Sequence, residues 1–180
     1  MSAIAPGMAA GLSYLACEGG GEAPIVLLHG IGSNAQSFGP LMRALATRRP
    51  GLAWDAPGYG ASQPLALPWP DASDYAAALS RLLVELAVPR CVLVGHSLGA
   101  LIAARFAVVS PQRIAALFLI SPALGYGTDK GAALPPAVAS RIEELDRLGA
   151  EKFAAARAPG LLAEPATRPD VLRAVETAMA

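Results

Sequence analysis

Residues 91–99 read CVLVGHSLG, and this stretch decides the fold that we expect for the 180-residue chain. The apolar run 91–94 predicts a buried strand, and residues 98–109 predict a helix that Ser110 and Pro111 stop. Gly95 and Gly99 lack the Cβ atoms that would clash in a tight turn between the two. The stretch therefore predicts a strand, a sharp turn and a helix in direct succession.

The alternation of strand and helix continues on both sides of this turn. Further β-like runs cover 11–17, 25–29, 52–55, 90–95 and 114–121, and helical patterns cover 34–48 and 73–87. Strands such as IVLL (25–28) and ALFLI (116–120) are apolar on both faces, which favours a parallel sheet covered by helices on both sides. We therefore expect an α/β fold with a mostly parallel sheet and helices on both faces.

The pattern changes after Pro122. From there to the end, the sequence has helical signals at 137–148, 151–158 and 170–179 and no convincing strand. We therefore expect residues 1–122 to form an α/β core and residues 123–180 a helical region inserted on the sheet.

Composition excludes several classes of function. Lys and Arg number 14 against 14 Asp and Glu, and no basic run exceeds Arg48-Arg49, so we expect neither nucleic acid nor a membrane surface as a partner. The longest apolar stretches fall far short of the ~18–20 residues that cross a bilayer. No basic residue precedes the apolar part of the N-terminus, which favours a cytoplasmic location.

The sequence also gives no sign of a metal or a cofactor. Two histidines and two cysteines do not form the spacing of a zinc site, and no nucleotide-binding fingerprint is complete. Cys17 and Cys91 favour roles as small buried residues over catalytic thiols, which need a nearby activating group.

Residues 95–99 also match G-x-S-x-G, the motif of a nucleophile elbow. A serine on such a turn has an exposed Oγ, and the first N–H groups of the next helix can stabilise a developing oxyanion. The bare pentapeptide also suits an ordinary tight turn, but its strand and helix flanks favour the chemical interpretation. Ser97 is therefore the candidate nucleophile.

Two more segments follow predicted strands, namely HGIG at 29–32 and DAPGYGAS at 55–62. In order and spacing, these segments and GHSLG resemble the α/β-hydrolase superfamily. They are most similar to its esterase, lactonase and haloperoxidase-like branch. The resemblance covers residues 24–122 in detail and extends more loosely to 180 as the helical cap of the family.

The resemblance implies a role for each matching residue. Ser97 becomes the nucleophile, and the backbone N–H groups of Leu98 and Ile31 form the oxyanion hole. Asp55 serves a structural turn more than catalysis, His29 braces the oxyanion loop, and His96 points away from the nucleophile. The supporting glycines are Gly30, Gly32, Gly95 and Gly99.

The activity that the resemblance implies is acyl transfer from a small-molecule substrate. A serine nucleophile disfavours the dehalogenase and epoxide hydrolase members, which attack with a carboxylate. We expect a serine hydrolase that acts on a small to medium ester, thioester or lactone through an acyl-enzyme. Enol-lactonase-like enzymes, carboxylesterases and cofactor-free haloperoxidase-like proteins all remain open, as does the oligomeric state.

The rest of the catalytic triad is absent. In this fold the acid and then the histidine follow the serine, but both histidines, His29 and His96, precede Ser97. The acidic residues after Ser97 lie in the helical region and are not assigned to the triad. We expect the chain to be nearly inactive alone, as the N-terminal part of a domain of roughly 250 residues whose last strands, acid and histidine lie beyond Ala180. The alternative is a non-catalytic α/β-hydrolase-like binding protein.

Overall fold

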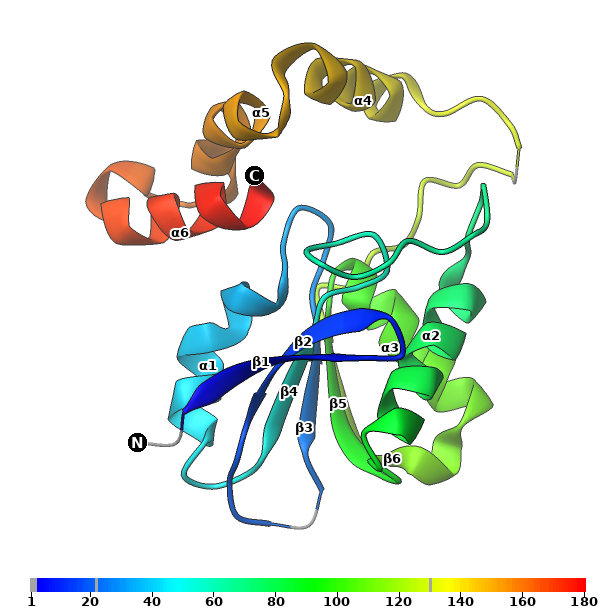
Figure 1. Ribbon diagram of the computed structural model, residues 1–180. Helices are drawn as coiled ribbons and strands as arrows, with labels where there is room; N and C mark the ends of the chain where they lie inside the picture. Colours follow the sequence, from blue (N-terminus) through cyan, green and yellow to red (C-terminus); the bar gives the residue numbers. More distant parts are fainter. Residues whose placement is uncertain (1–2, 22, 130) are drawn as a thin grey trace. The chain divides into compact units, whose positions relative to one another are not determined.

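A mixed six-stranded sheet organises the first part of the chain in the computed structural model (Figure 1). The structure describes residues 3–21, 23–129 and 131–180, and it divides into two units, Met1–Ala123 and Leu124–Ala180. Across the sheet, the strands follow the order β1 (Ile4–Ala9), β2 (Leu12–Cys17), β4 (Gly51–Trp54), β3 (Ile25–Leu28), β5 (Cys91–His96) and β6 (Ile114–Ile120).

Strands β4, β3, β5 and β6 run parallel, which confirms the mostly parallel sheet expected from the apolar runs. Their register aligns Leu28 of β3 with Gly95 of β5 and His96 of β5 with Ile120 of β6. The carboxyl ends of these three strands therefore meet at one edge of the sheet, where the loops that follow β3 and β5 lie side by side.

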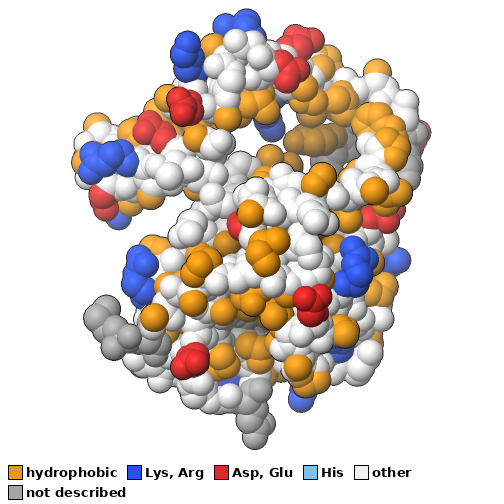
Figure 2. Space-filling view, in the orientation of Figure 1, with side chains coloured by type: hydrophobic (Ala, Val, Ile, Leu, Met, Phe, Trp, Pro, Cys, Tyr) orange, Lys and Arg blue, Asp and Glu red, His pale blue; other side chains and the backbone are white. Residues whose placement is uncertain are grey.

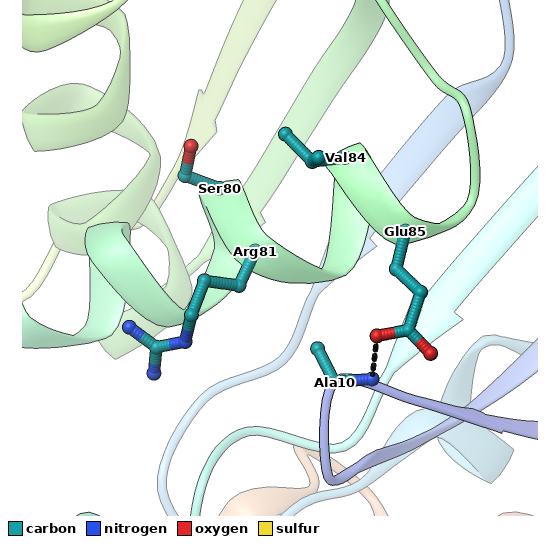
Figure 3. Close-up of a pocket in the computed structure, with 5 residues that line it drawn as sticks. All are labelled: Ala10, Ser80, Arg81, Val84 and Glu85. Atoms are coloured by element: carbon teal, nitrogen blue, oxygen red, sulfur yellow. Dashed lines mark hydrogen bonds between the residues drawn. The ribbon is translucent and has the colours of Figure 1, made fainter.

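Strands β1 and β2 form an antiparallel hairpin at one side of the sheet. Ala10 and Gly11 both have positive φ, 50° and 75°, as a two-residue hairpin turn of type I′ requires. The Glu85 carboxylate accepts a hydrogen bond from the Ala10 N–H at 2.8 Å and ties this turn to α2 (Ala72–Glu85) (Figure 3). The sequence pattern missed β1. An edge strand tolerates Pro6, which cannot donate to a second neighbour.

Helices cover both faces of the sheet, as expected (Figure 1). On one face, α1 (Gly39–Leu45) buries Met42 against Leu27 and Ala53. On the other face, α2 and α3 (Leu98–Val109) bury a larger apolar cluster that includes Val26, Leu28, Trp54, Leu79, Leu82, Leu93, Ile102 and Phe106. The chain between α3 and β6 forms the short 3₁₀ helix η2 (Pro111–Arg113).

The prediction of one helix over 34–48 is wrong in its length and its continuity. The segment starts as a 3₁₀ helix, η1 (Ala35–Phe38), and α1 begins only at Gly39 and ends at Leu45. Pro40 is the physical reason for the late start of α1, because proline lacks the N–H for a helical bond and clashes with the preceding turn. Proline is tolerated in the first turn of a helix, so it marks a start here.

Strand β6 lies at the other edge of the sheet. The strand contains no charged residue. Its last four side chains nevertheless keep 37–55% of their surface exposed, namely Leu117, Phe118, Leu119 and Ile120. Elsewhere, charged side chains of both signs are interspersed over the face drawn in Figure 2. Edge strands that expose apolar side chains on both faces are prone to pair with other chains.

The second unit is helical in its described part. Its helices are α4 (Pro136–Leu148), α5 (Ala150–Arg157) and α6 (Pro169–Met179), with short 3₁₀ turns η3 (Ala158–Leu161) and η4 (Pro165–Thr167). Phe153, Ala154 and Ala158 are buried within it. The Arg157 guanidinium lies over the Phe153 ring at 5.3 Å and pairs with Glu144 at 3.6 Å, so α4 and α5 pack together.

Candidate active site

Ser97 lies on a sharp turn between β5 and α3. Its backbone has φ 54° and ψ −115°, a region that residues with a Cβ rarely adopt. The Ser97 N–H donates to the Ile120 carbonyl at 3.0 Å, and the Ser97 carbonyl accepts from the N–H groups of Ala100 at 3.0 Å and Ala123 at 3.2 Å. The end of β6 and the start of α3 thus hold the strained serine in place.

The glycines on either side of this turn allow a very close approach of backbone segments. A Cβ atom on Gly95 would lie 2.3 Å from the Gly99 carbonyl oxygen. A Cβ atom on Gly99 would lie 2.2 Å from the Leu28 carbonyl oxygen and 2.7 Å from that of His29. Since real Cβ atoms do not come this close to backbone, only glycine lets α3 begin directly against β3.

The loop of residues 29–35 follows β3 and reaches the serine. A Cβ atom on Gly30 would lie 2.9 Å from the Ser97 Cβ and 3.4 Å from Nδ1 of the exposed His96. Leu98 is the first residue of α3, so its N–H has no acceptor within the helix. The Ile31 N–H has no backbone acceptor among the described residues, and the Ile31 side chain is 61% exposed. Ser97, Gly30, His96 and Leu98 are thus brought together.

His29 uses both of its ring nitrogens for backbone hydrogen bonds. Nε2 accepts from the Ala56 N–H at 3.0 Å, and Nδ1–H donates to the Gly30 carbonyl at 2.8 Å. The ring is 2% exposed and meets the Tyr59 ring edge-on, with ring centroids 4.8 Å apart. This arrangement requires a neutral imidazole with its proton on Nδ1, so His29 has no nitrogen left to serve as a base for Ser97.

The stability of the fold should depend on the protonation of His29. Burial is the largest effect on its pKa, which lies below the ordinary value of 6.5. Well above that pH, the ring is neutral in both the folded and the unfolded chain. His29 protonation then takes nothing from the free energy of unfolding. Below that pH, the unfolded chain takes up a proton that the folded chain resists, so the free energy of unfolding falls until the pH passes the folded pKa.

Urea unfolding between about pH 7.5 and about pH 5 measures this dependence. In that range, we expect the unfolding free energy of the wild-type chain to fall more steeply than that of His29→Gln, whose side chain does not titrate. His96→Gln is the matched control, because it replaces a histidine and leaves His29 in place, so the pH dependence that His29 causes should remain. Equal slopes for the wild type and His29→Gln would contradict the buried neutral ring.

Asp55 holds a turn and, among the described residues, makes no hydrogen bond to Ser97. Its carboxylate accepts from the Ala35 N–H at 2.8 Å and from the Ser13 hydroxyl at 2.6 Å, and its carbonyl accepts from the Ser62 hydroxyl at 2.7 Å. Gly60 has φ 53°, and a Cβ there would lie 2.7 Å from Asp55 Oδ2. The DAPGYGAS segment is therefore folded tightly around one carboxylate.

Sequence reasoning missed Ser13. This serine lies in β2, and its backbone N–H also donates to the Ser62 hydroxyl at 2.9 Å. The one available signal was a hydroxyl inside an otherwise apolar run, because a polar side chain in such a strand usually has a hydrogen-bond partner.

A family model described as "Alpha/beta hydrolase family" matches residues 25–180, which include the Ser97 turn and the 29–35 loop. The chain belongs to the alpha/beta hydrolase family. Among the described residues of this hydrolase-family chain, no three His, Cys, Asp or Glu side chains gather closely enough to hold a metal ion. None of its described helices has the length and apolarity that a bilayer crossing needs.

Two curated relatives of this hydrolase-family chain show how much of a longer protein it matches. It is 33% identical over 110 residues to the dihydrolipoyllysine-residue acetyltransferase component of the acetoin cleaving system of Cupriavidus necator, covering 61% of this chain and 29% of that protein. It is 32% identical over 118 residues to the pimeloyl-[acyl-carrier protein] methyl ester esterase of Pectobacterium carotovorum, covering 66% and 44%. The chain thus spans less than half the length of these relatives.

Solved structures share the fold of this hydrolase-family chain more completely. The enol-lactonase of Burkholderia xenovorans superposes with a TM-score of 0.78 at 21% identity, over 97% of this chain and 67% of that one. A hydrolase from Pseudomonas aeruginosa gives a TM-score of 0.67 at 26% identity, over 98% and 66%. About a third of each of these solved chains has no counterpart in residues 1–180.

Proposed function

We propose that this chain carries the nucleophile and the oxyanion hole of a serine hydrolase that cleaves a small to medium ester, thioester or lactone. The strained Ser97 turn between β5 and α3, with the Leu98 N–H and the 29–35 loop beside it, carries the proposal. The esterase among the curated relatives supports an ester as the substrate class. Within the proposal, residues 1–122 are the core and residues 123–180 are a cap region.

In the proposed reaction, Ser97 Oγ attacks the acyl carbon and gives its proton to a base. The carbonyl oxygen takes up the negative charge and accepts hydrogen bonds from the Leu98 and Ile31 N–H groups. The C–O or C–S bond then breaks, the leaving group takes the proton from the base, and an ester remains on Ser97. Water, deprotonated by the same base, releases the acid and restores the serine.

The base of this reaction is not His29, whose two nitrogens are both engaged with backbone. His96 precedes the nucleophile, whereas the histidine of an elbow serine comes from a later loop. We therefore place the acid and the histidine in sequence that residues 1–180 do not contain. A chain without that base also suits a non-catalytic binding protein of the same fold, which is the second candidate function.

Added imidazole separates these two functions, because it can act as an external base at Ser97. We expect p-nitrophenyl butyrate hydrolysis by residues 1–180 to rise with imidazole above the rate measured with Ser97→Ala, and to saturate with ester. A binding protein would give equal rates for the two chains at every imidazole concentration, and that result would overturn the proposal.

A further inference from the structure

Two adjacent residues after β4 hold both ends of the 29–35 loop. The Asp55 carboxylate accepts the Ala35 N–H at the end of the loop, at 2.8 Å. The Ala56 N–H donates to His29 Nε2 at the start of the loop, at 3.0 Å. Because Asp55 and Ala56 are neighbours in the chain, one short segment holds both ends of the loop.

The direction of the Ile31 N–H depends on the hydrogen bonds at the two ends of the loop. His29 Nδ1–H donates to the Gly30 carbonyl, and a trans peptide unit points its N–H opposite to its carbonyl. The Gly30 carbonyl and the Ile31 N–H belong to the same planar unit. A shift of His29 therefore turns the Ile31 N–H, which the proposed function uses as an oxyanion donor.

The Asp55 carboxylate is in turn fixed from β2. The Ser13 hydroxyl donates to Asp55 Oδ2 at 2.6 Å, a charge-assisted hydrogen bond, and its own position is set by the bond from the Ser13 N–H to Ser62. In the sheet, β4 and β3 separate β2 from β5, the strand that leads to Ser97. The hydrogen bond from Ser13 to Asp55 therefore links β2 to the residue that holds the end of the loop.

We propose that Ser13 is a positioning residue for the oxyanion hole, holding the Asp55 carboxylate so that residues 55 and 56 fix the 29–35 loop and the Ile31 N–H beside Ser97. The inference rests on the proposed function for its chemistry. Its structural part, the control of the loop by Ser13, stands on the hydrogen bonds alone.

The surroundings of Ser13 favour a variant that still folds. A surface cavity of about 350 Å³ is lined by Ser13, Ala35 and Asp55, so water can reach the carboxylate when the hydroxyl is removed. Ser13 is only half-buried. Ser13→Ala should therefore remove one hydrogen bond that positions the Asp55 carboxylate. Water can then bond to the carboxylate, so no buried charge is left without a partner.

Amide hydrogen exchange on residues 1–180 tests the structural part. In Ser13→Ala, we expect the Ala35 and Ala56 amides to exchange about tenfold faster, as for one lost hydrogen bond to a charged group, while the β5 amides keep their rates. Ser13→Thr keeps a hydroxyl and should restore slow exchange. Ser80→Ala, which removes a hydroxyl bonded to Arg113 at 3.2 Å, is the matched control and should leave the loop unchanged.

The imidazole-assisted hydrolysis of p-nitrophenyl butyrate tests the chemical part. We expect kcat to fall about tenfold in Ser13→Ala with little change in KM, because the ester still binds but the donor is misplaced. If Ser13→Ala does not fold, Asp55→Asn is the second variant. It should likewise lower kcat with little change in KM.

Unchanged exchange at Ala35 and Ala56, or faster exchange with an unchanged kcat, would overturn the inference. Failure of the proposed function gives a different result. Wild-type and Ser97→Ala chains would then hydrolyse the ester at equal rates, with either slow or fast amide exchange in the loop.

Discussion

Replacing Gly99 by alanine is expected to destabilise the sheet unit strongly. The new Cβ would lie 2.2 Å from the Leu28 carbonyl oxygen and 2.6 Å from its carbon, both in the backbone of the central strand β3. This carbonyl group cannot move aside without breaking hydrogen bonds of the sheet. The alternative is that α3 shifts away from β3. The cost should reach about 3 kcal/mol or more, a large share of the ~5–15 kcal/mol that stabilises an ordinary domain.

Urea unfolding followed by far-ultraviolet circular dichroism measures this loss. Gly160→Ala is the matched control, because a Cβ there meets nothing within 4 Å, and it should change stability by no more than about 0.5 kcal/mol. If Gly99→Ala unfolded at the same urea concentration as Gly160→Ala, α3 would not begin against β3 as described.

Gly30→Ala should instead preserve the fold and remove most of the activity. A Cβ on Gly30 would lie 2.9 Å from the Ser97 Cβ and 3.4 Å from His96 Nδ1, so it crowds the nucleophile. Gly30 does not have a positive φ, and alanine can adopt its backbone conformation. We expect the imidazole-assisted rate to fall about 10²-fold, as when an oxyanion donor is lost or displaced.

The measurement is the initial rate of p-nitrophenol release at equal concentrations of folded protein. Gly20→Ala is its control, since a Cβ there would lie 3.6 Å from the Arg48 carbonyl oxygen, an ordinary contact, and its rate should equal that of the wild type. A wild-type rate in Gly30→Ala would show that the 29–35 loop does not take part in the reaction.

Local sterics explain the part of the fold that sequence predicted well. The strand–turn–helix at 91–109 depends on two glycines and an apolar run that lie next to one another in the chain. The helix expected over 34–48 is wrong because apolar spacing carries no information about Pro40, which sets the start of α1. Strand β1 was missed because its pairing with β2, and not its own composition, makes it a strand.

The candidate site, like the fold, could be predicted only where the residues concerned lie close together in the chain. Motif spacing could name Ser97, Gly30 and Asp55, since each motif is a continuous segment. It could not find the bond between Ser13 and Asp55, which joins residues 42 positions apart in the chain. Such contacts follow from how strands are ordered in the sheet, and that order has no periodic signal in the sequence.

The most direct test of a nucleophilic Ser97 is mass spectrometry of the 180-residue chain after reaction with a fluorophosphonate in the presence of imidazole. We expect one phosphonyl group, located by peptide fragmentation on Ser97 and absent from Ser97→Ala. A chain that stays unmodified, or that carries the label equally on other serines in both proteins, would contradict it.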